Sequence, residues 1–384
     1  MKHIRLLAAF ASVLLSPLAW AQDAPKKPPP LQEIHSAADR EYFSFAFSPD
    51  ARFLAAGAAG SVRLLYEAGG KFTEAGVLNQ KGRVDDLIFD PAVKILISRS
   101  RDQDALVWDT DGWAPLKFAT EDLTGGGLAL RAGAQKAREE VCSCAVLSNR
   151  TRGLRLWMTN GLRRKSRSVA QVDVRDWADV SLGHVTAVAW DGAALLAGDD
   201  QGYLYRLPDA RKLVEKLDDS TVVLGKIAQS PANAHVFQPH LGEVTAIGLA
   251  AKARRCVTAG MDGKVRLWDL EKIAPMAPGR KAAIIAPEWE IAGQAAELSA
   301  DGKYLAVADA DGVGVYQAAS GVALSWNPTR VAGGRVVRLR FDADGKHLAG
   351  ILCRCTECGQ GGAIEVVRPH RRMSDHGGVL VIWK

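Results

Sequence analysis

The sequence lacks the short motifs that identify several large classes of enzyme. It contains no Gly-x-Ser-x-Gly nucleophile elbow, no His-Glu-x-x-His pair and no glycine-rich phosphate-binding loop. No pair of carboxylates has a spacing that singles it out for acid–base catalysis. Because each of these chemistries needs its residues at a set spacing, their absence predicts a protein without catalysis of its own.

The sequence also lacks an apolar run long enough to cross a bilayer as a helix. Residues 6–15 are mostly apolar, but a spanning helix needs about 20 such residues. Lys2 and Arg5 precede this run, and Ala19-Trp20-Ala21 follows it with small residues at the spacing of a cleavage site. We therefore predict a signal peptide over 1–21, cleavage near Ala21 and a periplasmic or secreted protein.

A strong excess of charge of one sign is also absent. The formal net charge is +6, from 49 basic and 43 acidic residues, which is too mild to indicate nucleic-acid binding. Export disfavours that partner as well, so we expect no nucleic acid. Residues 22–30 (QDAPKKPPP) read as an extended linker, and the repeat described next predicts one domain over 31–384.

What the sequence does contain is a repeat. An apolar strand ends in a similar way seven times, at intervals typical of arrays of small sheets. The copies, which define units one to seven, are 62–66 (VRLLY), 105–109 (ALVWD), 154–157 (LRLW), 203–207 (YLYRL), 265–269 (VRLWD), 313–316 (VGVY) and 379–383 (VLVIW). Turn signals such as Asp344-Gly345 separate the strands within a unit. The predicted fold is all-β.

The two ends of the repeat region predict how it closes. The last copy, 379–383, is followed only by Lys384, so its sheet lacks an outer strand. Residues 31–36 (LQEIHS) precede the first unit and have no sheet of their own. We predict that this N-terminal strand pairs with the C-terminal strand and closes a single seven-bladed β-propeller, which would cover two exposed sheet edges.

This repeat resembles the WD-repeat β-propeller family over essentially all of 31–384, as an exported bacterial member with degenerate repeats. Unit five carries the best match, with His240 before its first strand and then Thr258, Asp262 and Trp268 at the family's positions. The resemblance implies a buried hydrogen-bonded chain from His to Asp and from His through the hydroxyl to Trp, in which each buried polar group finds a partner.

Two other units keep parts of this pattern. Unit two has Ser98, Asp102 and Trp108, but Gln80 occupies the histidine position. Unit four has His184 without a convincing tryptophan. We interpret His184 and His240 as members of structural networks rather than as catalysts.

The resemblance implies a non-catalytic protein–protein interaction scaffold, which the predicted export places in the cell envelope, as a monomer or as part of a hetero-complex. A rigid ring with preorganised loops lowers the ordering cost of binding. Clustered basic residues predict docking to other envelope proteins, including acidic ones. These candidate partner-binding residues are Arg163, Arg164, Lys165, Arg167, Arg368, Arg371 and Arg372. We expect no membrane span and no bound cofactor.

Six cysteines leave an alternative open. In an oxidising compartment disulfides are the default. A soft-ligand cluster near the chain end would instead suit zinc or copper, or thiol-redox chemistry. Its members are Cys353, Cys355, Cys358, His370 and His376. A second alternative is a propeller enzyme with its site in the central channel, whose lining residues the sequence does not locate.

Overall fold

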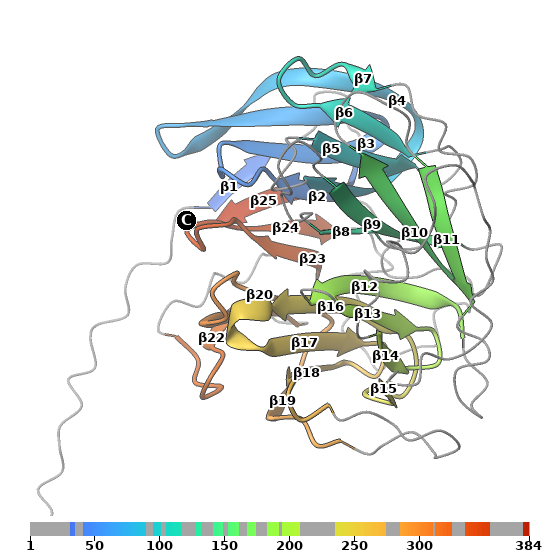
Figure 1. Ribbon diagram of the computed structural model, residues 1–384. Coiled ribbons are helices and arrows are strands. Elements are labelled where there is room, and N and C mark those ends of the chain that lie inside the picture. The colour runs from blue at the N-terminus through green and yellow to red at the C-terminus, as the bar shows by residue number, and fades with distance from the viewer. Residues whose placement is uncertain are drawn as a thin grey trace, which may run out of the picture.

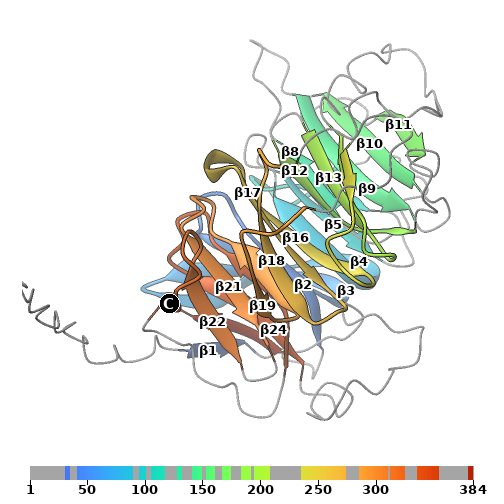
Figure 2. The ribbon, with the colours of Figure 1, turned by 90° about the horizontal axis from the view of Figure 1, so that it is seen from below.

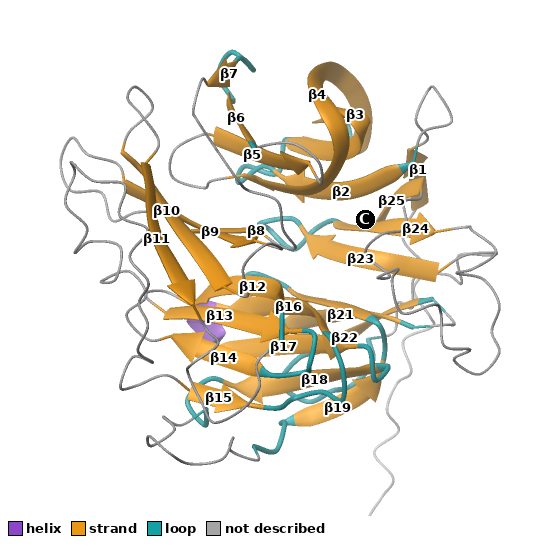
Figure 3. Ribbon diagram, turned by 90° about the vertical axis from the view of Figure 1, so that its right-hand side faces the viewer, coloured by secondary structure: helices purple, strands orange, loops and turns teal. Residues whose placement is uncertain are grey.

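The computed structural model of the chain is dominated by β-strands (Figure 3). It describes residues 31–34, 41–89, 95–100, 105–116, 128–131, 141–148, 153–160, 167–173, 183–191, 194–207, 235–273, 285–309, 312–324, 335–353 and 379–383. Within these ranges the one helical element is the short 3-10 helix η1 (Ala251–Ala253). No helix of the described residues has the length and apolar character needed to cross a membrane.

Strand pairing groups the described strands into six sheets, and the all-β prediction is confirmed. The largest contains β2 (Tyr42–Phe47), β3 (Phe53–Ala68), β4 (Lys71–Phe89), β5 (Ile95–Ser100), β6 (Leu106–Asp109) and β7 (Pro115–Leu116). The next two contain β8 (Leu128–Arg131), β9 (Val141–Ser148), β10 (Gly153–Asn160) and β11 (Arg167–Asp173), then β12 (Val185–Asp191), β13 (Ala194–Asp199), β14 (Leu204–Leu207) and β15 (His235–Phe237).

The remaining sheets belong to units five, six and seven. They contain β16 (Val244–Ala250), β17 (Arg255–Gly260), β18 (Lys264–Asp269) and β19 (Trp289–Ala292), then β20 (Ala295–Leu298), β21 (Tyr304–Ala308) and β22 (Val313–Gln317), then β23 (Arg335–Phe341), β24 (Leu348–Cys353), β25 (Val379–Trp383) and β1 (Leu31–Ile34). Figure 1 shows the sheets one after another in chain order, and in Figure 2 β1 lies near β24 of the last sheet.

The long strand β3 combines two strands of unit one in one element. Its first half pairs with β2 and its second half with β4. Its two ends lie side by side, because the rings of Phe53 and Tyr66 are 5.2 Å apart and the Glu67 amide donates to the Arg52 carbonyl. The chain therefore reverses within β3 near Gly60, whose φ of 81° suits glycine.

Strand β4 belongs to two units, and this explains why six sheets stand where seven units were predicted. Residues Lys71 to Arg83 of β4 pair with β3, whereas Val84 to Phe89 pair with β5. Gly82, with φ of 78°, lies where the strand passes from one partner to the other. Pairing alone therefore leaves seven separate blades unestablished, and no hydrogen-bonded ladder joins one of the described sheets to the next.

The N-terminal strand pairs with the C-terminal strand, as the sequence predicted. Strands β1 and β25 are antiparallel with Leu31 opposite Trp383 and Ile34 opposite Leu380, and the two lie side by side near the C-terminus (Figure 1). In addition, the first strands of successive units contact one another in chain order, from β2 through β4, β8, β12, β16 and β20 to β23, and β23 contacts β2.

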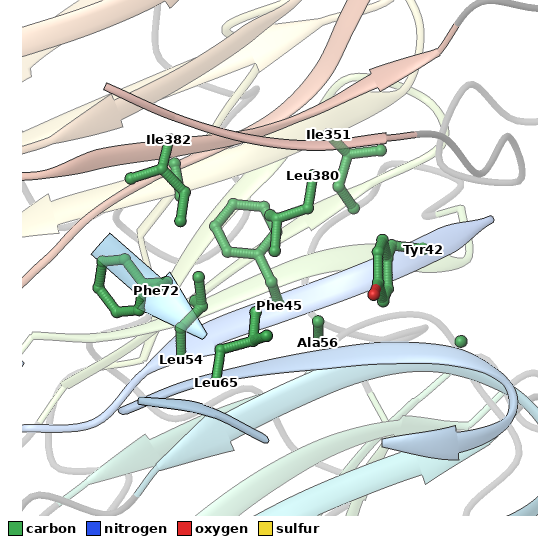
Figure 4. Close-up of a cluster of buried hydrophobic side chains, with 11 residues drawn as sticks. Tyr42, Phe45, Leu54, Ala56, Leu65, Phe72, Ile351, Leu380 and Ile382 are labelled. Carbon is green, nitrogen blue, oxygen red and sulfur yellow. The ribbon is translucent and has the colours of Figure 1, made fainter. Parts of the chain in front are cut away.

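The core lies between neighbouring sheets rather than inside one sheet. One cluster joins Tyr42, Phe45 and Leu54 from unit one to Ile351 and Leu380 from unit seven (Figure 4). Similar clusters join units one and two, four and five, five and six, and six and seven. Units one, five, six and seven therefore each bury both faces of their sheets against neighbours, which suits the apolar strands that the repeat carries.

Candidate functional site: the face of units four and five

The four residues that the sequence singled out in unit five come together in one hydrogen-bonded chain. Trp268 Nε1 donates to Thr258 Oγ1 over 2.9 Å, and Thr258 Oγ1 lies 2.8 Å from His240 Nε2. His240 Nδ1 lies 2.9 Å from Asp262 Oδ1. A neutral imidazole that accepts from the threonine hydroxyl and donates to the carboxylate satisfies both of these partners, while Arg266 Nη1 also lies 2.8 Å from His240 Nδ1.

Burial favours that neutral histidine. The His240 side chain is 0% exposed, and burial lowers its pKa, although Asp262 acts in the opposite direction. Burial would raise the pKa of Asp262, but hydrogen bonds from Arg266 and His240 outweigh it and lower that pKa. Arg266 donates from Nη1 to Asp262 Oδ2 over 2.8 Å, so the carboxylate joins the buried chain to a surface ion pair.

Unit two has a shorter version of the chain. Trp108 Nε1 donates to Ser98 Oγ over 2.7 Å. Gln80 donates to the Ser98 carbonyl oxygen over 3.3 Å, and its own Oε1 is buried without a hydrogen-bond partner. Asp102 lies outside the described residues, so its part in this network stays a prediction.

Unit four differs from the sequence interpretation, because His184 is not buried. Its side chain is 43% exposed and pairs with Asp200 over 3.2 Å. The reason lies in the strand register, because Val185 pairs with Asp199 as Val244 pairs with Gly260 in unit five, and His184 therefore corresponds to Glu243 and not to His240. A Cβ at Gly260 would lie 2.4 Å from the His240 ring. In unit four Asp199 stands at the position of Gly260, and the residue that corresponds to His240 lies outside the described residues.

Asp199 is the centre of a different buried network, which sequence reasoning missed. Its carboxylate accepts from Tyr205 Oη and from the amides of Gly183, Gln201 and Tyr203. Burial raises the pKa of Asp199, and burial together with that carboxylate raises the pKa of Tyr205. The signal available in the sequence was an aspartate at the strand end with a tyrosine on the next strand, whereas a tryptophan had been sought.

Three turns of units four and five form one continuous surface, which we name the four–five ledge and define as residues 200–202, 240–242 and 261–263. The His240 amide donates to the Gly202 carbonyl over 3.3 Å. A Cβ on Gly202 would lie 2.1 Å from the His240 carbonyl oxygen, so only glycine permits this approach. The Met261 amide donates to the Glu243 carbonyl over 2.9 Å, and a Cβ on Gly242 would lie 3.6 Å from Met261 Cβ.

Two large apolar side chains of the four–five ledge face solvent. Leu241 is 80% exposed and Met261 is 45% exposed. Their turns are held from below by Asp262, whose carboxylate also accepts from the Leu241 amide over 3.4 Å. An exposed apolar pair on fixed backbone is the kind of feature that marks an interaction site, because a partner would bury it with little loss of conformational freedom.

Apart from Cys353, the structure does not describe the predicted partner-binding side chains or the predicted metal-binding residues. The side chains of Arg163, Arg164, Lys165, Arg167, Arg368, Arg371 and Arg372, and the residues Cys355, Cys358, His370 and His376, lie outside the described residues. Cys353 is buried at the end of β24 and Cys256 is buried in β17. No group of side chains able to hold a metal occurs within the described residues, so the zinc, copper and thiol-redox alternatives stay predictions.

Comparisons with known proteins agree with this geometry. The family model described as "WD domain, G-beta repeat" matches residues 232–269, which include the whole hydrogen-bonded chain of unit five. Pre-mRNA-processing factor 19 of Oryza sativa subsp. japonica is 33% identical over 127 residues, or 32% of this chain and 22% of the relative. Pre-mRNA-processing factor 19 homolog 2 of Arabidopsis thaliana is 33% identical over 147 residues, or 37% and 26%.

Solved structures are similar over nearly the whole chain. The structure of U3-55K has a TM-score of 0.60 at 16% identity and covers 93% of this chain and 100% of that one. The crystal structure of the RRP9 WD40 repeats gives 0.60 at 16% identity, with coverage of 93% and 98%. The β-propeller domain of Cps50 (Swd1) from Myceliophteria thermophila gives 0.59 at 14% identity, with coverage of 92% and 99%.

The fold is similar to that of solved β-propellers, and residues 232–269 match one WD repeat. Such a fold is consistent with a protein-interaction scaffold. The matched segments cover 22% and 26% of the curated relatives, about a quarter of each, so the similarity to those relatives concerns the repeat and not their whole length.

The comparisons also correct the predicted location. The sequence predicted a periplasmic or secreted protein, but the relatives are pre-mRNA-processing factors of two plants. The prediction of a periplasmic or secreted protein was therefore wrong, and these relatives give no support to an exported bacterial member of the cell envelope. It relied on ten mostly apolar residues after two basic ones, a pattern of composition that does not specify a destination. The disulfide prediction and the envelope partners depended on export and lose their support with it.

Proposed function

We propose that this chain is a non-catalytic protein-interaction scaffold, built on a seven-bladed β-propeller of residues 31–384, and that the four–five ledge is where a partner docks. The pairing of β1 with β25 and the chain-order contacts from β2 to β23 support the closed ring. One observation carries the docking role. Leu241 and Met261, 80% and 45% exposed, lie on turns that hydrogen bonds to Asp262 hold in place.

The physical argument is one of preorganisation. The chain through Trp268, Thr258, His240 and Asp262 links the core of unit five to the two turns that carry Leu241 and Met261. Residues on fixed turns lose little freedom when a partner covers them, so most of the burial energy appears as affinity. Burying one such side chain fully contributes about 1.5–3 kcal/mol.

Site-directed crosslinking tests this proposal. A photo-reactive amino acid replaces Leu241 in one variant and Val322 in another, because Val322 is also exposed (58%) but belongs to unit six. Each full chain is expressed in its native cells, irradiated and analysed by mass spectrometry. We expect one protein crosslinked in near-stoichiometric yield from position 241 and not from 322. Equal, low crosslinking from both positions would contradict the proposal.

A further inference from the structure

The four–five ledge differs in charge from the rest of the chain. The whole chain has a net charge of +6, whereas among the described residues of the ledge and the adjoining positions 264, 266 and 290 carboxylates outnumber cationic side chains. The carboxylates belong to Asp200, Asp262 and Glu290, and the cations to Lys264 and Arg266.

Both cations are already engaged with carboxylates. Lys264 Nζ lies 2.6 Å from Glu290 Oε1, and Arg266 Nε lies 3.0 Å from Glu290 Oε2. Arg266 also bonds Asp262, as described above. Pairing of this kind leaves neither cation available as the main contact for an anionic partner, and Asp200 is the carboxylate of this set that lies outside these pairs.

Asp200 supplies negative charge at the unit-four end of the ledge. Its side chain is 27% exposed, and its carboxylate accepts from the His184 amide over 2.8 Å and lies 3.2 Å from His184 Nδ1. The neighbouring Gln201 side chain is exposed and donates to the same carboxylate over 3.4 Å. A cationic side chain approaching Leu241 from unit four would therefore meet a carboxylate with a defined position.

We propose that the partner docks through a peptide segment with an aliphatic or aromatic anchor flanked by lysine or arginine. The anchor lies against Leu241 and Met261, and the flanking cations face the carboxylates at the margin of the ledge. This proposal rests on the proposed function and specifies its partner. It also reverses the sign expected from the sequence, in which basic clusters indicated acidic partners. Electrostatic complementarity of this kind sets specificity and association rate more than total affinity.

A defined peptide panel tests the chemistry directly. Twelve-residue peptides carry a central Leu, Phe or Trp flanked by Lys and Arg, the same centres flanked by Asp and Glu, or a central Ser flanked by Lys and Arg. Binding to the full chain is measured by biolayer interferometry at two salt concentrations. We expect the basic peptides with an apolar centre to bind at least about tenfold more tightly than either other set, equivalent to about 1.4 kcal/mol, and to weaken with salt.

Surface variants separate the apolar and the charged contributions. Leu241→Ser should weaken binding of the basic apolar peptides about tenfold, whereas the matched variant Val322→Ser should leave it unchanged. Gln201→Lys should weaken the basic peptides and strengthen the acidic ones, and Gln201→Glu should do the opposite. Leu241, Val322 and Gln201 are all exposed, so the variants are expected to fold normally.

The outcomes distinguish the partner chemistry from the proposed function. Preferential binding of acidic peptides, or binding by no peptide of the panel, overturns the inferred partner. If a protein still crosslinks from position 241 in cells, the docking role stands and only its chemistry is wrong. If crosslinking from 241 also fails, the proposed function itself is lost.

Discussion

Units four and five place different residues at the same point of the sheet, and each builds a different buried network there. In unit five Gly260 leaves room for the buried ring of His240, whereas in unit four Asp199 stands at the position of Gly260 and accepts from Tyr205 and from the Gly183 amide. In both units the buried side chain at this point has hydrogen-bond partners. The two units thus keep a satisfied polar group at this point, while the residues that provide it vary.

The substitution with the largest expected effect fills the space beside the His240 ring in unit five. Gly260→Ala would place a Cβ 2.4 Å from the His240 ring, so the ring must leave and its partners lose their bonds. Overpacking and unsatisfied groups together should lower the free energy of unfolding by about 4 kcal/mol. Urea unfolding measures the change. Gly263→Ala is the control, since its Cβ would meet nothing within 4 Å and only its positive φ costs about 1 kcal/mol. Equal losses in the two variants would contradict the prediction.

A second prediction compares the complete chain of unit five with the shorter one of unit two. Thr258→Val removes the hydroxyl that serves both Trp268 and His240, and we expect a loss of about 2–3 kcal/mol. Ser98→Ala removes one partner, that of Trp108, and should cost about 1–2 kcal/mol. Thermal and urea unfolding give both values. The interpretation fails if Ser98→Ala proves the more costly change.

A third, smaller effect distinguishes two buried tryptophans. Trp268 donates to Thr258, whereas Trp383 Nε1 is buried without a hydrogen-bond partner and lies over Gly350, the residue that corresponds to Thr258. Trp268→Phe should therefore cost about 1 kcal/mol more than Trp383→Phe. Unfolding of the two variants in parallel measures the difference, and the loss of ring volume is common to both.

The smallest effect is a dependence on pH that unit five should show. Burial holds the folded-state pKa of His240 below 6.5, so the folded state disfavours the charged ring. The free energy of unfolding is therefore at its full value above pH 6.5, and it decreases as the pH falls from 6.5 toward the folded-state pKa of His240. His240→Gln should make the unfolding free energy flatter across this range. A remaining slope is expected from His235, whose pKa burial also lowers. An unchanged slope in His240→Gln would show that other groups carry the effect.

Much of the architecture was predictable because it depends on patterns that recur along the chain. The apolar strands and turn residues indicated an all-β array, and the unpaired ends indicated that β1 and β25 pair. The chain of His240, Thr258, Asp262 and Trp268 could be placed because four residue types stand at set spacings. Asp199 and Tyr205 could not, since their network depends on which side chain reaches a shared point in space and follows no repeated spacing.

The four–five ledge was also beyond sequence reasoning. Leu241 and Met261 are separated by a whole hairpin and look like ordinary apolar residues of a repeat. Their exposure, and the unit-four turn that lies against them at Gly202, appear only once the two sheets are packed. The charge clusters that did stand out in the sequence, such as Arg163-Arg164-Lys165, lie outside the described residues, so their role in partner binding stays a prediction.

The pairing of β1 with β25 has a consequence for how the molecule folds. Leu31 and Trp383 lie about 350 positions apart in the chain and yet stand opposite each other in one ladder. Contacts of such long sequence separation carry a large loop-closure entropy before they return any stability, and they are typically made late in folding. The ladder between β1 and β25 is therefore expected to form late. The inner units can fold from nearby contacts as the polypeptide emerges from the ribosome, but β1 can pair with β25 only after β25 has been synthesised.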